Sequence, residues 1–235
     1  MNLPISKRLL ACAAFVAPGD RVADVGCDHG YLSIHLLREG IASQVIAGDI
    51  RPMPLESAIR NAEKYGVRDR IAFYLSDGVK SIPRNFDTLV CAGMGGDTMI
   101  SILKAAPWLK SKDYRLILQC QSKTPLLRKY LSAQGWRIAK ESVLRDGRFL
   151  YTVMEVLWQP DTPRLTTGQW YFPPALLLDP SPELPEYYDR LIFRLRRAVG
   201  NRGSQADPEM AEALRELEND PAYNPLKEKH HDNCQ

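Results

Sequence analysis

The sequence lacks the features that define several large protein classes. Its longest apolar runs, such as residues 9–16, are much shorter than the ~20 residues that a membrane-spanning helix needs. It contains no CxxC pair and no GxGxxG loop. These absences argue against a membrane protein, a zinc scaffold and a dinucleotide-dependent oxidoreductase. A basic pair precedes the apolar run at residues 9–16, but we interpret this segment as an amphipathic helix and not as a signal peptide, so we expect a cytoplasmic protein.

Cysteine is scarce and widely spaced. The five cysteines are Cys12, Cys27, Cys91, Cys120 and Cys234, an odd number with no pair at the spacing of metal ligands. Three of them fall within apolar, strand-like runs, where a cysteine behaves as a small hydrophobic side chain. We therefore expect all five to be reduced and structural, and we expect no metal site.

Length and charge suggest two parts of different character. The chain has 235 residues, enough for one full domain and a small addition, with ordinary globular proportions of 45% hydrophobic and 25% charged residues. Residues 1–158 contain 22 Lys and Arg against 15 Asp and Glu, whereas residues 159–235 contain 9 against 13. The basic first part suits an anionic partner, either a nucleic acid or a small ligand, but the excess is too modest to choose between them.

Short buried strands alternate with helices over the first part. We expect strands at residues 21–25, 44–49, 70–75, 86–92 and 115–120, then two longer strands at 137–145 and 148–158. Asp146–Gly147 between the last two is a strong hairpin signal. The order predicts an α/β fold of the Rossmann-like type, with a mostly parallel sheet that ends in an antiparallel hairpin.

The composition changes at about residue 159. Seven prolines lie between residues 159 and 185, so we expect a proline-rich connector there after a first domain at residues 1–158. Residues 186–226 show apolar spacing typical of helices and predict a small helical hairpin of the coiled-coil type. The polar residues 227–235 are expected to form a flexible tail.

The most informative motif is VADVGCDHGYL at residues 22–32. A strand ends at Asp24, and a turn through Gly26 and Gly30 opens a helix. In an open α/β sheet, ligands bind at this end of the strands, and glycine lets the backbone approach them closely. Acidic residues in the turn would repel a pyrophosphate, but they suit the cationic amino-acid end of S-adenosylmethionine. A plain strand-to-helix turn is the alternative.

Three later strand ends carry related motifs. Asp49 ends AGDI, where a carboxylate can accept the hydroxyls of a ribose or cap the next helix. The sequence LSDG at residues 75–78 places Asp77 near an adenine, or in an ordinary turn. The sequence AGMGG at residues 92–96 provides a backbone-lined floor where methyltransferases of exocyclic amines usually carry [DN]PP[YF]. This floor suits a nucleophile that needs no strong base, although close packing alone would also explain the glycines.

Together these segments resemble a known family. ISKRL (5–9), DVGCDHGYL (24–32), AGDI (47–50), SDG (76–78), AGMGG (92–96), LILQ (116–119) and RDGRFLYTVMEV (145–156) are similar to the bacterial tRNA adenine-N1 methyltransferases that act on position 22. The resemblance covers residues 1–158. It implies a class I fold, S-adenosylmethionine as cofactor and tRNA as substrate.

The resemblance also implies roles for individual residues. The methionine end of the cofactor would contact Asp24, Gly26, Cys27 and Gly30. Asp49 and Ile50 would hold the ribose and one face of the adenine, and Ser76, Asp77 and Gly78 would hold the adenine edge. Gly93 and Met94 would face the methyl group that is transferred.

The remaining hypotheses concern catalysis and RNA binding. The candidates for charge stabilisation near the base are Asp28 and Asp77, with Asp97 weaker; His29 would relay a proton and Tyr31 would stack on a flipped base. Basic residues that flank the motifs are candidate RNA contacts: Lys7, Arg8, Arg51, Lys123, Arg128, Lys129 and Arg145. We expect a monomer or a weak dimer. The alternatives are a small-molecule methyltransferase on the same fold and a non-catalytic RNA-binding protein.

Overall fold

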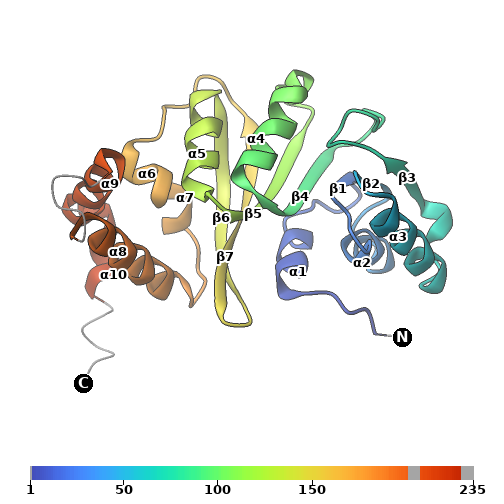
Figure 1. Ribbon diagram of the computed structural model, residues 1–235, viewed down its shortest axis with the longest axis horizontal. Coiled ribbons are helices and arrows are strands. Elements are labelled where there is room, and N and C mark those ends of the chain that lie inside the picture. The colour runs from blue at the N-terminus through green and yellow to red at the C-terminus, as the bar shows by residue number, and fades with distance from the viewer. Residues whose placement is uncertain (1, 201–206, 229–235) are drawn as a thin grey trace.

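A computed structural model describes residues 2–200 and 207–228 (Figure 1). In this part of the chain seven strands form one sheet in the order β3-β2-β1-β4-β5-β7-β6. The strands are β1 (Arg21–Val25), β2 (Gln44–Asp49), β3 (Ile71–Leu75), β4 (Thr88–Gly95), β5 (Arg115–Ser122), β6 (Trp136–Asp146) and β7 (Phe149–Trp158). Strands β1 to β5 are parallel, and β7 pairs antiparallel with both β5 and β6. The predicted Rossmann-like fold is confirmed.

Helices cover both faces of this sheet. The elements of the first part are α1 (Lys7–Ala13), α2 (Tyr31–Arg38), α3 (Pro52–Lys64), α4 (Gly96–Ala105) and α5 (Thr124–Ala133), with 3-10 turns η1 (Arg68–Arg70) and η2 (Pro107–Leu109). Helix α2 contacts both α1 and α3, and α4 contacts α5 on the other face (Figure 1). This is the layered arrangement that the alternation of strands and helices predicts.

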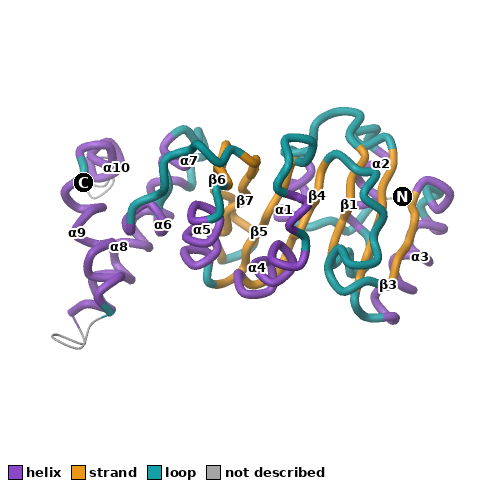
Figure 2. The backbone as a smooth tube through the Cα atoms, turned by 90° about the horizontal axis from the view of Figure 1, so that it is seen from above, coloured by secondary structure: helices purple, strands orange, loops and turns teal. Residues whose placement is uncertain are grey.

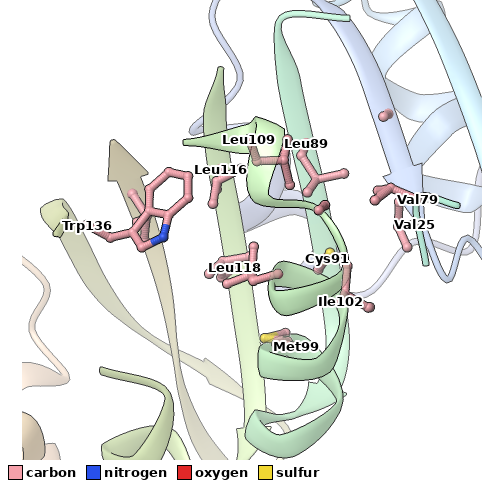
Figure 3. Close-up of a cluster of buried hydrophobic side chains, with 14 of the residues drawn as sticks. Val25, Val79, Leu89, Cys91, Met99, Ile102, Leu109, Leu116, Leu118 and Trp136 are labelled. Atoms are coloured by element: carbon pink, nitrogen blue, oxygen red, sulfur yellow. The ribbon is translucent and has the colours of Figure 1, made fainter. Parts of the chain in front are cut away.

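Alternating strand residues supply the two cores. Leu89 and Leu118 point to the face of α4 and α5, where they join a buried cluster with Met99 and Trp136 (Figure 3). Ala23 belongs to the same cluster. Their neighbours in sequence, such as Val22, Val90 and Ile117, point to the opposite face and pack with the first three helices. Because side chains alternate across a strand, strands buried on both faces are apolar throughout.

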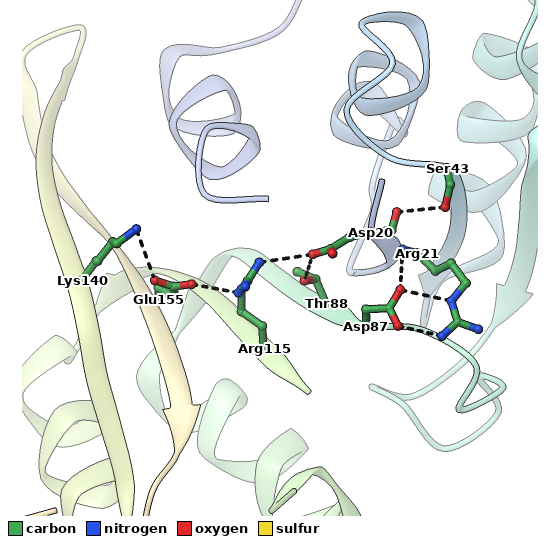
Figure 4. Close-up of polar contacts among 8 residues, drawn as sticks. All are labelled: Asp20, Arg21, Ser43, Asp87, Thr88, Arg115, Lys140 and Glu155. Atoms are coloured by element: carbon green, nitrogen blue, oxygen red, sulfur yellow. Dashed lines mark hydrogen bonds and ion pairs between the residues drawn. The ribbon is translucent and has the colours of Figure 1, made fainter. Parts of the chain in front are cut away.

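A network of charged residues joins the strands at the amino ends of β1 and β5. Arg115 forms ion pairs with Asp20 at 3.3 Å and with Glu155 at 2.8 Å (Figure 4). Beside it, the Arg21 guanidinium donates to Asp87, which lowers the pKa of that carboxyl group. These contacts lie at the edge away from the carboxyl ends of the parallel strands, where ligands bind, so we assign them a structural role.

The proline-rich segment and the C-terminal helices build a third core. Helices α6 (Thr167–Tyr171) and α7 (Pro174–Leu177) precede α8 (Leu184–Gly200), α9 (Pro208–Asn219), η4 (Pro221–Tyr223) and α10 (Asn224–Glu228). Phe172 is fully buried, with its ring against those of Tyr188 and Tyr223. Figure 2 shows α8, α9 and α10 at one end of the molecule, beyond the β6–β7 edge. The proline-rich segment therefore contributes helices and packing contacts.

Two findings concern the expectations about membranes and cysteines. No helix in residues 2–200 and 207–228 is both long and apolar enough to cross a membrane. Cys12, Cys27, Cys91 and Cys120 are buried and free of disulfides, and burial raises the pKa of Cys12 and Cys91 to about 12. Cys234 lies outside the described residues.

Candidate active site

A cavity of about 470 Å³ opens at the carboxyl ends of β1, β2, β3 and β4. Strand β1 lies between β2 and β4, so the chain reverses its direction of travel across the sheet there. Such a switch point is the usual ligand site of an open α/β sheet. Residues from the ends of five strands, β1 to β5, and from α1, α2 and α4 line the cavity, which places the predicted motifs around one space.

The turn after β1 holds a buried carboxylate beside a glycine. Asp24 is 3% exposed and accepts a hydrogen bond from the Ser33 hydroxyl at 2.7 Å. Burial raises the pKa of Asp24 to about 6, because desolvation outweighs the hydrogen bonds from Ser33. Gly26 has a φ of +74°, and a Cβ there would lie 2.3 Å from the Met94 Cε. Only glycine fits this turn while the Met94 side chain lies against it.

Asp49 ends β2 and organises the neighbouring backbone. One carboxylate oxygen accepts the Arg51 amide at 2.9 Å, and the other accepts the Asp28 amide at 3.2 Å. The side chain is 4% exposed, and the Arg51 guanidinium lies 3.7 Å from it. Asp28 itself has a φ of +49°, a conformation that aspartate tolerates better than most residues. The carboxylate therefore joins the turns after β1 and β2 and still faces the cavity.

The third strand end is held by hydrogen bonds within its own turn. The buried Ser76 hydroxyl donates to the Gly78 carbonyl at 2.9 Å and accepts the Ser81 amide at 3.0 Å. Asp77 is more exposed and forms an ion pair with Lys80 at 2.5 Å. Ser76 thus shapes the loop, and Asp77 presents a carboxylate at the cavity rim.

Strand β4 ends in a bulge. We predicted a strand that stops at Ala92, but β4 continues to Gly95 and α4 begins directly at Gly96. The pairing with β5 shifts register on either side of Met94. Bulges of this kind redirect side chains next to active sites. The predicted strand end is wrong because the glycine-rich segment stays extended and pairs with β5.

A buried glutamine fixes this bulge. The Oε1 atom of Gln119, which is fully buried, accepts the Gly93 amide at 3.0 Å and the Arg8 Nη1 at 3.1 Å. Arg8 also lies 3.4 Å from Asp146 and places its guanidinium 5.2 Å from the centre of the Tyr151 ring. Helix α1 and the β6–β7 hairpin are thereby tied to the floor of the cavity.

Comparison with known proteins agrees with this geometry. A family model described as a methyltransferase domain matches residues 5–154. The chain belongs to the methyltransferase domain family. The matched segment ends within β7, so it contains the whole cavity wall described above.

The names of individual relatives of this methyltransferase specify a substrate as well as the type of reaction. It is 33% identical to the tRNA (adenine(22)-N(1))-methyltransferase of Bacillus subtilis over 154 residues, which span 65% of each chain and thus slightly less than two thirds of that relative. The structure of the B. subtilis m1A22 tRNA methyltransferase TrmK matches 97% of this chain and 99% of its own at 26% identity, with a TM-score of 0.76. Sp1610 of Streptococcus pneumoniae in complex with S-adenosyl-L-methionine matches 94% and 99% at 28% identity, with a TM-score of 0.78. The predicted resemblance is confirmed.

Most of the residues predicted to contact the cofactor surround the cavity of the methyltransferase. The lining includes Asp24, Gly26, Cys27, Asp49, Ile50, Ser76, Asp77, Gly78, Gly93 and Met94. Gly30 is the exception, because it caps the amino end of α2 and packs against α3, where an added Cβ would lie 2.9 Å from the Ala58 Cβ. Its role is close packing of the turn.

The predicted catalytic residues divide into two groups. Asp28 and Asp77 line the cavity. His29 and Tyr31 are not among the residues that line it. Their ring centroids lie 5.8 Å apart, and the His29 Nε2 lies 3.9 Å from an Asp28 carboxylate oxygen. The proposed proton relay and base stacking by these two residues therefore receive no support from the geometry. The weaker candidate, Asp97, is also outside the cavity and forms an ion pair with Lys123 at 2.5 Å.

The predicted RNA contacts occupy different environments. Arg8 and Arg51 line the cavity. Lys7 and Lys123 are exposed, and each lies within two residues of a lining residue in the sequence. Lys129 and Arg145 are partly exposed and paired with Glu209 and Glu186 respectively. Arg128 is wrong as an RNA contact, because its side chain is fully buried and paired with Glu141.

Sequence reasoning missed several polar residues of the wall. Thr98 and Ser101 line the cavity from α4, and Gln121 lines it from the end of β5. Gln119 supports the floor from below, as described. The signal for the glutamines was the sequence LILQCQS, in which polar residues interrupt an apolar strand at the ligand-binding edge.

Proposed function

We propose that this protein transfers a methyl group from S-adenosylmethionine to N1 of an adenine in tRNA, at position 22. The observation that carries the proposal is the pair of buried carboxylates, Asp24 and Asp49, at adjacent strand ends of one cavity. The relatives named for this reaction support the choice of substrate and cofactor. A bacterial tRNA substrate would place the protein in the cytoplasm.

The residues present fit this cofactor. Gly26 lines the cavity with backbone alone beside Met94, and Asp24 provides a buried anion for an ammonium group. Asp49 offers carboxylate oxygens for ribose hydroxyls, and Ile50, which is 60% exposed, offers an apolar surface for an adenine face. When bound, the cofactor supplies an electrophilic methyl group.

The floor formed by the β4 bulge suits adenine N1 as the nucleophile. This nitrogen has an in-plane lone pair and needs no prior deprotonation, so the protein needs no strong base. Gly93 and Met94 can admit the base edge, while Asp28 and Asp77 at the rim can stabilise the positive charge that develops on it. Positioning and exclusion of water account for the rest of the rate enhancement.

The direct test is methyl transfer from labelled S-adenosylmethionine to bulk bacterial tRNA. We expect label in 1-methyladenosine after nucleoside analysis. A transcript with guanine at position 22 should accept no label, whereas the matched transcript with adenine should. Cofactor binding without label in any tRNA nucleoside would contradict the proposal and favour a small-molecule methyltransferase.

Cofactor affinity is expected to fall as the pH falls through the pKa of Asp24. The pKa of about 6 means that the carboxylate, which pairs with the cofactor ammonium, is mostly ionised at pH 7 and mostly neutral at pH 5. Affinity for S-adenosylhomocysteine, measured by calorimetry, should therefore drop about tenfold over this range. Asp24→Asn should bind weakly with a flat profile, and His29→Ala should keep the wild-type profile. A wild-type profile that is flat from pH 7 to pH 5 would contradict this role.

A further inference from the structure

A second cleft, of about 630 Å³, adjoins the cofactor cavity. It lies between the start of β7, the segment that links β5 to α5, and the helices α8 and α9. Gln121 lines both spaces. Tyr151, in the wall of the cleft, stacks against the guanidinium of Arg8, which lines the cavity. The two spaces are therefore neighbours at one edge of the sheet.

The cleft combines aromatic rings with positive charge. Phe149 is 51% exposed at the tip of the hairpin, and Tyr151 and Tyr187 line the wall. Lys123 and Arg194 add exposed cations. The ion pair between Lys123 and Asp97 is about 60% exposed on both sides, so it costs little to exchange for another anion.

Acidic side chains contact this cleft only from behind its lining, where Glu209 lies beside Tyr171 and Asp97 pairs with Lys123. None of its described lining residues is Asp or Glu, although residues 159–235 contain 13 acidic against 9 basic residues. Glu186 is paired with Arg145 and Arg190, and Glu218 is paired with Arg196. The C-terminal unit, although acidic in composition, thus presents apolar, aromatic and basic side chains to the space beside the active site.

We propose that this cleft binds an unpaired nucleotide of the RNA substrate next to the adenine that is methylated. The base stacks on Phe149 or Tyr151, and Lys123 and Arg194 contact its phosphates. Aromatic stacking combined with basic side chains is the usual way in which proteins hold single-stranded RNA. The proposal rests on the proposed function.

The chemistry of the target explains why such a site is needed. Adenine N1 lies on the Watson–Crick edge, so a paired adenine must leave its partner before it can react. Unstacking one base exposes its neighbour, and a stacking surface at the mouth of the cavity would compensate for part of that cost. The cleft and the cofactor cavity share Gln121 in their walls. A nucleotide next to the adenine in the cavity would therefore lie in or beside the cleft.

The test is a pair of double variants of the full chain. Phe149→Ala with Arg194→Ala removes one stacking ring and one cation of the cleft. Phe193→Ala with Arg197→Ala removes the same residue types from the exposed surface of α8 outside the cleft. Affinity for fluorescently labelled tRNA is measured by anisotropy, together with S-adenosylhomocysteine binding and the oligomeric state by sedimentation.

The cleft variant should bind tRNA at least about tenfold more weakly and show a raised KM for tRNA, with cofactor affinity unchanged. The control variant should stay within about twofold of wild type for tRNA. Equal tRNA affinity in the cleft variant and wild type overturns the proposal, and a shift in oligomeric state alone would assign the cleft to contact between copies and also overturn it. A wild-type protein that neither binds nor methylates tRNA would instead refute the proposed function.

Discussion

Replacing Asp49 by alanine is expected to lower the affinity for S-adenosylmethionine by about 100-fold or more. The variant loses the acceptor for the ribose hydroxyls, and hydrogen bonds to a charged group contribute about 1.5–3 kcal/mol each. It also releases the Asp28 and Arg51 amides that the buried carboxylate holds at 3.2 and 2.9 Å. Both turns that shape the cavity would then lose a common support. Calorimetry with S-adenosylhomocysteine measures the effect.

Two further variants separate binding from a general loss of structure. Asp49→Asn keeps the shape and one acceptor oxygen, so its affinity should lie between those of the wild type and of the alanine variant. Asp69→Ala removes an exposed carboxylate from η1, away from the cavity, and should bind like wild type. An Asp49→Ala variant that binds the cofactor within about tenfold of wild type would show that the carboxylate does not contact the ribose.

The sequence was sufficient to predict the part of the site that depends on strand ends. Asp24, Asp49 and Asp77 each follow a short apolar run, and parallel strands must bring their carboxyl ends to one edge. No long-range contact is needed for this inference. The β6–β7 hairpin was also predictable from local sequence, because Asp-Gly at residues 146–147 favours a two-residue hairpin turn.

Features that depend on distant partners were not predictable from local pattern. The bulge at Met94 exists because β5 pairs with the glycine-rich segment and Gln119 holds the Gly93 amide. In sequence, those glycines look like an ordinary turn. Arg128 looks like a surface residue of a helix in the same way, since nothing near it in sequence reveals the partner on β6 that buries it.

The prolines at residues 159–185 indicated a connector but did not reveal the short helices α6 and α7 within it. Proline favours connectors, but it is also tolerated in the first turn of a helix. Pro174 begins α7 in this way, and Thr166 caps α6 with a reciprocal bond to Gln169. The aromatic residues between the prolines supply the buried contacts that hold these short helices in place.

Replacing Arg128 by alanine is expected to destabilise the protein by about 3–5 kcal/mol. Removal of one partner leaves the other charge buried and uncompensated, and this cost is large for a fully buried pair. Arg128 is 0% exposed and Glu141 is 2% exposed, with 2.5 Å between the guanidinium and the carboxylate. The Trp170 and Tyr171 carbonyls, which accept from the same guanidinium at 3.0 and 2.7 Å, would also lose their donor.

Urea denaturation of matched variants distinguishes the buried pair from ordinary surface pairing. Lys129→Ala breaks the neighbouring ion pair with Glu209, which is partly exposed, and should cost less than about 1 kcal/mol. The double variant Arg128→Met with Glu141→Leu removes both buried charges and should recover much of the loss. Because Arg128 joins α5, β6 and α6, its loss should also weaken the attachment of the C-terminal helices and, with it, affinity for tRNA. An Arg128→Ala variant within about 1 kcal/mol of wild type would mean that this attachment rests on the apolar contacts of the third core alone.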